Sequence, residues 1–386
     1  MAPPAAPATP ILEPPTPVVT PGLVDWGTAQ RVAEWWIARS PAPASYRPGA
    51  LEADFAELTA EAEGLVAAAT GLRPPSPARA RVTDRAGWVR ANVASIQRLL
   101  GPTLVKFEAQ RTAAGSAAHL ARWLPRPLAG AGRTVSGAQL GLVLAWMSTR
   151  VLGQYDLLLT EDAGDEQDLV YYVGPNVVAL ETRYGFPARE FRLWLALHEV
   201  THRCQFTAVP WLRDHFVSLV DQGLEPTAAD PRRLAEAIRR AADEVRAGRS
   251  PLNDAGVLGL VASPEQLEAL QRIQALMSLL EGHGDVTMDR AGAAAVPGAE
   301  RFSRVLRERR QQVHGPARLL QKILGLEAKL RQYAEGEKFV NEVERVGGPD
   351  LFNRVWRGPE WLPSLAEIRN PTDWVSRVGP PPAVTG

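Results

Sequence analysis

The residues with the clearest chemical potential lie in one short stretch, the HExxH pattern of residues 198–202. On a helix, histidines four positions apart lie on one face, about one turn from each other. His198 and His202 could then bind one metal ion, and zinc–nitrogen bonds of about 2.0–2.1 Å suit this spacing. Glu199 would lie beside the pair, where a carboxylate takes a proton from water instead of binding the metal.

The segment around these histidines is typical of a buried helix. Pro187 suits a first helical turn, where the N–H that proline lacks has no partner in any helix. Phe191, Trp194 and Leu195 lead into the histidine face. Polar side chains on a buried face need partners. A metal ion would supply them, and the alternative is a pair of core histidines satisfied by hydrogen bonds.

A second segment, residues 263–292, has the pattern of a helix and offers the missing ligand. It opens with a capping-box sequence, SPEQ at 263–266, and its apolar residues then recur at helical spacing. Glu281 directly follows the apolar run, and a buried carboxylate needs a cation or hydrogen-bond donors. We therefore predict Glu281 as the third metal ligand, with His283 as the rival ligand.

Two further residues of this segment are candidates for supporting contacts. Asp285 lies one turn after Glu281, where its carboxylate could accept a hydrogen bond from the distal N–H of a ligating histidine. His283 is two positions after Glu281 and faces elsewhere unless the neighbouring glycines distort the helix. The alternative is that all three side chains only cap a helix end.

Composition and charge describe a globular protein. The chain has 386 residues, 45% hydrophobic and 22% charged, which allows a sizeable core. Its 43 basic and 43 acidic residues argue against a nucleic-acid or membrane-surface role. The most apolar run, residues 138–147, is shorter than the roughly 20 residues of a membrane span. Cys204 is the single cysteine, which fits a cytoplasmic protein without disulfides.

The domain organisation follows from the proline-rich ends. Residues 1–22 are rich in proline and alanine and lack signal-peptide features, so we predict a disordered tail, with a second tail at 379–386. Between them we expect a single domain, 23–378, with a helical scaffold over 23–152 and a catalytic part over 153–378. The predicted scaffold helices cover about 25–39, 50–70, 84–100, 103–123 and 136–152.

The character of the sequence changes before the HExxH segment. Residues 169–181 are rich in β-branched residues and tyrosine, and Gly174-Pro175-Asn176 interrupts them. We interpret this stretch as two short strands around a turn. An edge strand beside the HExxH helix would bind an extended peptide by main-chain hydrogen bonds. The expected fold class is therefore mainly α with a small β-sheet (α+β), the HExxH helix packing beside the sheet within a helical body.

Several blocks together resemble one known family. They are HEVTHRCQF at 198–206, VLGQYDLLL at 151–159, YYVGPN at 171–176, MSLLEGHGDVTMD at 277–289 and GPARLLQKILGLEAKLRQY at 315–333. Over residues 24–378 the chain is similar to the actinobacterial zincin-like metallopeptidase family of unknown function. Some of its members are labelled hydrolases, and one branch is described as associated with deazaflavin coenzyme biosynthesis. The resemblance implies a zincin-like fold, with zinc at His198, His202 and Glu281 and Glu199 as the catalytic residue.

The sequence thus predicts a zinc-dependent hydrolase, most simply a peptidase-like one. A water activated by Zn²⁺ would attack an amide carbonyl while Glu199 acts as general base. The substrate would be a peptide or a small amide. Two alternatives stay open: an inactive zincin-fold scaffold or partner-binding protein, and a hydrolase of a non-peptide amide in coenzyme metabolism.

Overall fold

The computed structural model describes residues 24–113, 126–155, 168–225, 239, 263–311 and 326–379. The predicted tails fall outside these ranges except for Gly379. The elements of the first half are α1 (Trp26–Ile37), α2 (Pro48–Thr70), β1 (Arg79–Thr83), α3 (Arg85–Ala113), α5 (Arg126–Ser148), β2 (Gly153–Tyr155), β3 (Leu169–Val173) and α6 (Gly174–Tyr184). Those that follow are α7 (Ala188–Ala208), α8 (Leu212–Leu224), α11 (Pro264–Gly292), α12 (Ala299–Gln311), α14 (Leu326–Phe352), η2 (Asn353–Trp356), η3 (Pro359–Trp361), α15 (Leu365–Arg369) and α16 (Pro371–Val378).

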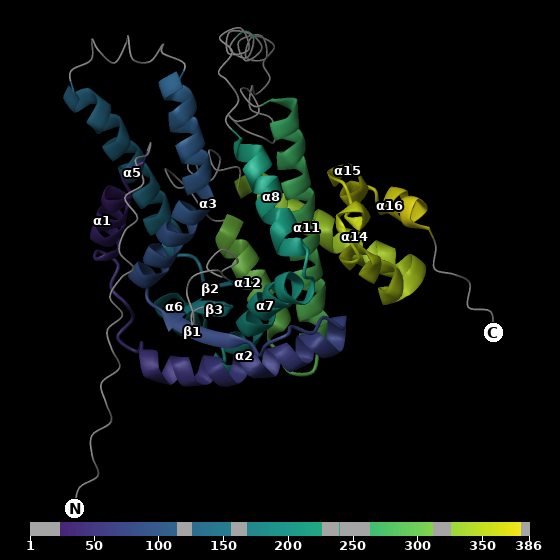
Figure 1. Cartoon of the computed structure of the whole chain (residues 1–386). Coiled ribbons are helices and arrows are strands. Elements are labelled where there is room, and N and C mark those ends of the chain that lie inside the picture. Colours follow the sequence, from purple (N-terminus) through teal and green to yellow (C-terminus); the bar gives the residue numbers. More distant parts are fainter. Residues whose placement is uncertain are drawn as a thin grey trace, which may run out of the picture.

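A small mixed sheet lies inside this helical body (Figure 1). Its strand order is β1-β3-β2, with β1 parallel and β2 antiparallel to the central strand β3. Every residue of β3 is buried, as expected for a short apolar run at the centre of a sheet. The predicted class, mainly α with a small β-sheet, is confirmed.

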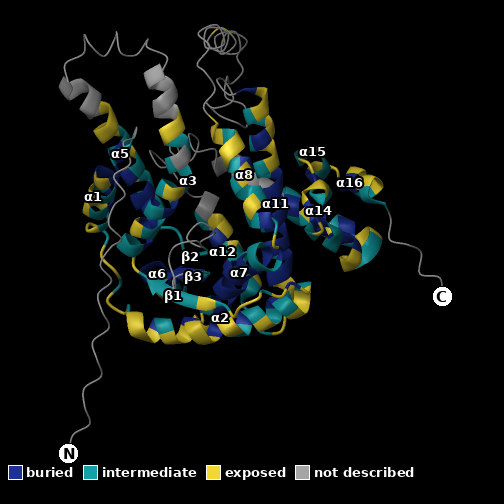
Figure 2. Ribbon diagram, viewed as in Figure 1, coloured by how far each residue is buried: buried dark blue, intermediate teal, exposed yellow. Residues whose placement is uncertain are grey.

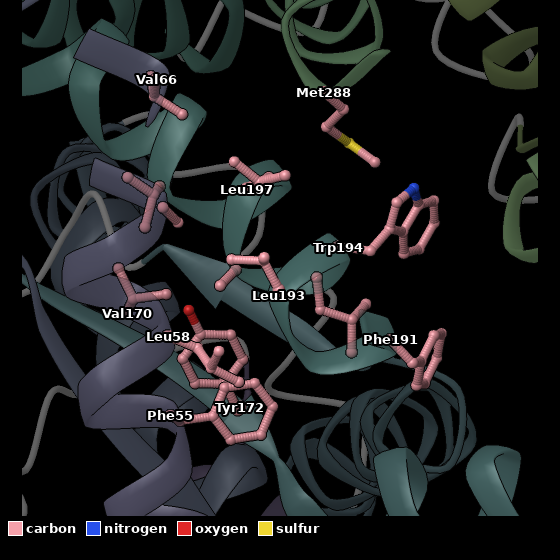
Figure 3. Close-up of a cluster of buried hydrophobic side chains, with 14 of the residues drawn as sticks. Phe55, Leu58, Val66, Val170, Tyr172, Phe191, Leu193, Trp194, Leu197 and Met288 are labelled. Carbon is pink, nitrogen blue, oxygen red and sulfur yellow. The ribbon is translucent and has the colours of Figure 1, made fainter. Parts of the chain in front are cut away.

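The main core forms where α2 and α7 pack against each other beside the sheet. Phe55 of α2 stacks on Tyr172 of β3 with ring centroids 3.8 Å apart, and Leu193 and Leu197 of α7 lie in the same cluster (Figure 3). Figure 2 shows α7 buried, while many residues of α2 are exposed on its outer side. The HExxH helix is therefore an interior element whose polar side chains must find partners.

The helix α11 crosses α14 at unusually short range, because both carry glycine at the contact. A Cβ atom on Gly282 would lie 2.1 Å from the backbone carbon of Gly336, and one on Gly336 would lie 1.9 Å from the carbonyl oxygen of Ser278. No side chain fits between backbones at this distance. The crossing is adjacent to Glu281, so it sets where that residue lies.

The N-terminal helices α1, α3 and α5 form a second apolar cluster around Trp26, Trp88 and Leu144. Val173 at the end of β3 belongs to the same cluster. The prediction of separate helices over 84–100 and 103–123 is wrong, since α3 continues through Gly101 and Pro102 as one helix to Ala113. Asp84 caps this helix, because its side chain accepts a hydrogen bond from the Gly87 N–H at 2.6 Å.

The predicted hairpin at 169–181 is also wrong in its second half. Only β3 forms, and α6 begins at Gly174 without an intervening loop. Pro175 lies in the first helical turn, where its missing N–H is harmless. The Asn176 side chain donates to the carbonyls of Ser148 and Val151, both at 2.7 Å, so it is a buried tertiary contact and not a turn residue.

Two surprises complete the fold. The strand β1 comes from an arginine-rich stretch that carries little strand signal, and it pairs with β3 along its whole length. After the break in α14 at Gly347 and Gly348, the C-terminal residues fold as short helices around Trp374. None of the described helices combines the length and the apolar character of a membrane span.

Candidate metal centre

The helix α7 places both histidines of the HExxH pattern on one face. It begins at Ala188, with Pro187 at the N-cap, one position before its expected place in the first turn. The His198 and His202 rings lie with centroids 4.7 Å apart and nearly perpendicular planes. Their side chains keep 28% and 15% of their exposure, so the face is enclosed but reachable. This is the geometry that i, i+4 spacing predicts.

The helix α11 brings Glu281 to the same point. Its Oε2 atom lies 3.6 Å from Nε2 of His202 and 3.9 Å from Nε2 of His198. One ligand atom from each of the three residues lies within 4.8 Å of the others. The expected group of His198, His202 and Glu281 is therefore assembled from two helices far apart in the chain.

This donor set fits zinc. Tetrahedral bonds of about 2.0–2.1 Å hold two ligand atoms about 3.3–3.4 Å apart, close to the observed nitrogen–oxygen separations. Two imidazoles and one carboxylate also match the ligand set of catalytic zinc sites, which keeps a fourth position open. Without a cation, burial lowers the pKa of His202, but the Glu281 and Glu199 carboxylates and the Gln205 side chain together outweigh burial and raise that pKa to about 9.

Glu199 lies beside this group on the side of the sheet. Its side chain is buried, and its carboxylate accepts a hydrogen bond from the backbone N–H of Tyr155 in β2. A Cβ atom on Gly153 would lie 2.6 Å from Cγ of Glu199, so the carboxylate rests against the glycine. Burial raises the pKa of Glu199 to about 7, with His202 lowering it and Glu281 raising it. A carboxyl group whose pKa lies near neutral pH suits proton transfer.

The distal nitrogens of both histidines contact neutral partners. Nδ1 of His202 lies 3.0 Å from Oε1 of Gln205, and Nδ1 of His198 lies 3.2 Å from the sulfur of Met288. Figure 3 shows the Met288 side chain directed toward Trp194 of α7. Sequence reasoning missed both partners. Gln205 was detectable, because it follows His202 by three positions on a helix and so shares its face.

His283 and Asp285 lie on the same helix as Glu281 but in different surroundings. His283 is buried with its ring stacked on Phe352, and its Nδ1 atom lies 2.9 Å from Nε2 of Gln205. It is absent from the three-residue ligand group and touches it through Gln205. Burial lowers the pKa of His283 to about 3, so it is neutral. Asp285 is half-buried one turn after Glu281, and its supporting role stays a prediction.

Arg203 and Cys204 directly follow His202, and both are buried. The Arg203 side chain is fully buried and donates to Asp168 at 2.9 Å, to Glu63 at 2.6 Å and to the Ser76 carbonyl at 2.7 Å. These contacts join α7 to α2 and to the segment before β3. Cys204 is buried, and burial raises the pKa of its thiol to about 12, so it behaves as a small apolar side chain.

Comparison with known proteins places this geometry in context. A solved structure similar to this chain is that of a "putative hydrolase with a novel fold" from Chloroflexus aurantiacus. The two chains share 30% sequence identity with a TM-score of 0.65, and the alignment covers 92% of this chain and 98% of that one. No curated protein matches the chain. A family model described as zincin-like metallopeptidase matches residues 24–375, and the chain belongs to this family.

Proposed function

We propose that the protein is a zinc-dependent hydrolase that cleaves the amide bond of a peptide. The observation that carries the proposal is the convergence of His198, His202 and Glu281 on one point, with Glu199 beside it. Family membership and the neighbouring hydrolase structure support a zinc hydrolase. Peptide cleavage, the identity of the ion and the role of each residue are the further steps proposed here.

The ligands and Glu199 have separate tasks in this proposal. Zinc, when bound, supplies a Lewis acid that polarises a carbonyl and lowers the pKa of water to about 7. His198 and His202 offer neutral Nε2 atoms, and Glu281 offers the one negative charge. Glu199 accepts the proton of the attacking water and then donates it to the leaving amine. The Tyr155 N–H holds the Glu199 carboxylate in place through both steps.

The strand β2 supports a peptide as the substrate. Its Gln154 pairs with Tyr171 of β3, and Leu152 just before it accepts a hydrogen bond from the Val173 N–H. The alternation of an antiparallel strand then turns the backbone groups of Gly153 and Tyr155 away from β3. No other described strand lies along this outer edge, and an extended peptide could pair there with the backbone groups other than the Tyr155 N–H, which would bring its carbonyl beside Glu199.

Two substitutions test the proposal on the purified chain. Wild type should contain one zinc ion per chain, and Glu199→Ala should keep the zinc while losing peptide hydrolysis by about 10²–10⁴-fold. His202→Ala should lose the zinc itself. Peptide turnover that survives Glu199→Ala would contradict the assigned role. Zinc without any hydrolysis of a peptide library would favour a metal-stabilised scaffold instead.

A further inference from the structure

A buried amide group connects the two helices of the candidate metal centre. The side chain of Gln205 is fully buried on α7, three residues after His202. Its Nε2 atom donates to the carbonyl of Leu280 at 2.9 Å and lies 2.9 Å from Nδ1 of His283. Its Oε1 atom lies 3.0 Å from Nδ1 of His202. Both polar atoms of the amide therefore have partners, and the two partners on α11, Leu280 and His283, lie on either side of Glu281 in the sequence.

The chemistry of these contacts leaves one arrangement of hydrogens. A backbone carbonyl only accepts, so the atom facing Leu280 must be the NH₂ group of Gln205. Its oxygen then faces His202, and Nδ1 of His202 must carry the proton. The second N–H of the amide points to His283, whose Nδ1 atom must accept. His202 thereby keeps its proton on Nδ1, so Nε2, the atom directed at Glu281, is the one left to bind a cation.

We propose that Gln205 is the positioning residue of the metal centre. It holds the His202 ring with Nε2 available to a cation, and it holds the turn of α11 that carries Glu281 at a set distance from α7. His283 accepts the second N–H of the amide, and its ring packs against Phe352 and Trp356. The inference rests on the metal centre of the proposed function and adds to it a residue outside the ligand set.

The Gln205 amide differs from the carboxylate that often accepts a hydrogen bond from a metal-binding histidine. A carboxylate partner strengthens a ligating imidazole, and the loss of such a supporting contact typically costs about 10–100-fold in metal affinity. Here the acceptor is a neutral amide, so its contribution is orientation more than charge. The same amide also donates to the Leu280 carbonyl. Its removal therefore takes a hydrogen bond from His202 on α7 and from the turn of α11 that carries Glu281. We expect a loss within that range even though no ligand is changed.

The test compares zinc affinity among full-length variants by competition with a chromophoric chelator. Gln205→Met preserves length and apolar volume but removes all three contacts, and its zinc dissociation constant should rise by about 10–100-fold. Ser278→Ala is the matched control. Ser278 is equally buried on α11, three residues before Glu281, and within the described part of the chain its hydroxyl bonds the Gln274 carbonyl of its own helix and no other group. Its zinc affinity should equal that of wild type.

Stability of the metal-free variants, measured in urea, separates positioning from folding. A purely structural Gln205 would lower stability in Gln205→Met while the folded protein bound zinc as tightly as wild type, and that result would overturn the inference. If Gln205→Met does not fold, His283→Phe takes its place, because it removes one acceptor and keeps the stacked ring. Its zinc affinity should fall below that of Ser278→Ala, and equality would again overturn the inference. Wild type without zinc would instead refute the proposed function.

Discussion

The two helices that form the candidate centre are held in place by different means. Side chains fix α7, since the fully buried Arg203 pairs with acidic residues of two other segments. Backbone proximity fixes α11, since Gly282 meets Gly336 of α14 without room for a side chain. The position of α7 thus depends on paired charges, and the position of α11 depends on glycines that have no side chain.

This difference shows where each ligand's position originates. The histidine pair needs only helical spacing, so its geometry is already set within five residues. Glu281 reaches the histidine pair only because α11 packs beside α7 with Glu281 level with His198 and His202 along the helix. That approach depends on the glycine crossing and on Gln205, neither of which resembles a metal motif.

The largest effect should come from the charge cluster that holds α7. Arg203→Met leaves Asp168 and Glu63 without their cation, and we expect a loss of about 3–5 kcal/mol in the free energy of unfolding. Urea denaturation measures it. Arg189→Met is the control on the same helix, because Arg189 is 60% exposed and pairs with surface acids. Its cost should be about 0–1 kcal/mol. Equal losses would contradict the role assigned to the buried pair.

The next effect concerns the ligand from α11. Glu281→Gln replaces a carboxylate with a poorly coordinating amide, so zinc affinity should fall by more than the roughly 100-fold upper range for a supporting contact. Asp285→Asn makes the same change one turn later and should cost less. Chelator competition compares the two. If Asp285→Asn released zinc while Glu281→Gln retained it, the ligand assignment on α11 would be reversed.

A smaller effect should separate catalysis from metal binding. Gly153→Ala places a methyl group against the Glu199 carboxylate and must shift it. A displacement near 1 Å costs up to about 100-fold in rate. We expect peptide hydrolysis to fall within that range while zinc content stays at one per chain. Gly64→Ala on α2 meets no atom within 4 Å and should leave the rate unchanged. Full activity of Gly153→Ala would refute the contact.

The smallest effect distinguishes two glycines of α11. Gly282→Ala forces a methyl group into the backbone of α14, and we expect a cost of about 1–3 kcal/mol in stability. Gly284→Ala places its methyl group 3.6 Å from the His202 ring, an ordinary contact. Its cost should stay below about 0.5 kcal/mol. Thermal denaturation of both proteins reports the difference, and similar melting temperatures would show that α11 does not depend on its close crossing.

Much of this architecture was predictable because its signals are local. The capping box of Ser263 and Gln266 forms as expected at the start of α11. The helices α1 and α2 begin and end within two residues of the predicted bounds. The HExxH spacing gave the orientation of His198 and His202. In each case the decisive contacts lie within a few positions along the chain.

Several of the errors and omissions involve distant partners. Asn176 looked like a turn residue because its ties to Ser148 and Val151 are invisible in the sequence. The strand β1 exists because β3 offers it a full parallel ladder, not because its residues favour strands. Gln205 carries no signal except its position after His202. Its partners on α11 become apparent only when the two helices are packed.

The ion pairs of Arg203 have a consequence for metal exchange. Because they hold α7 whether or not an ion is present, a chelator should strip the centre without unfolding the chain. Cobalt could then be introduced into the native protein and would report the ligand field by its visible absorption. The site would behave as a preformed receptor, unlike small zinc domains that collapse when their ion is removed.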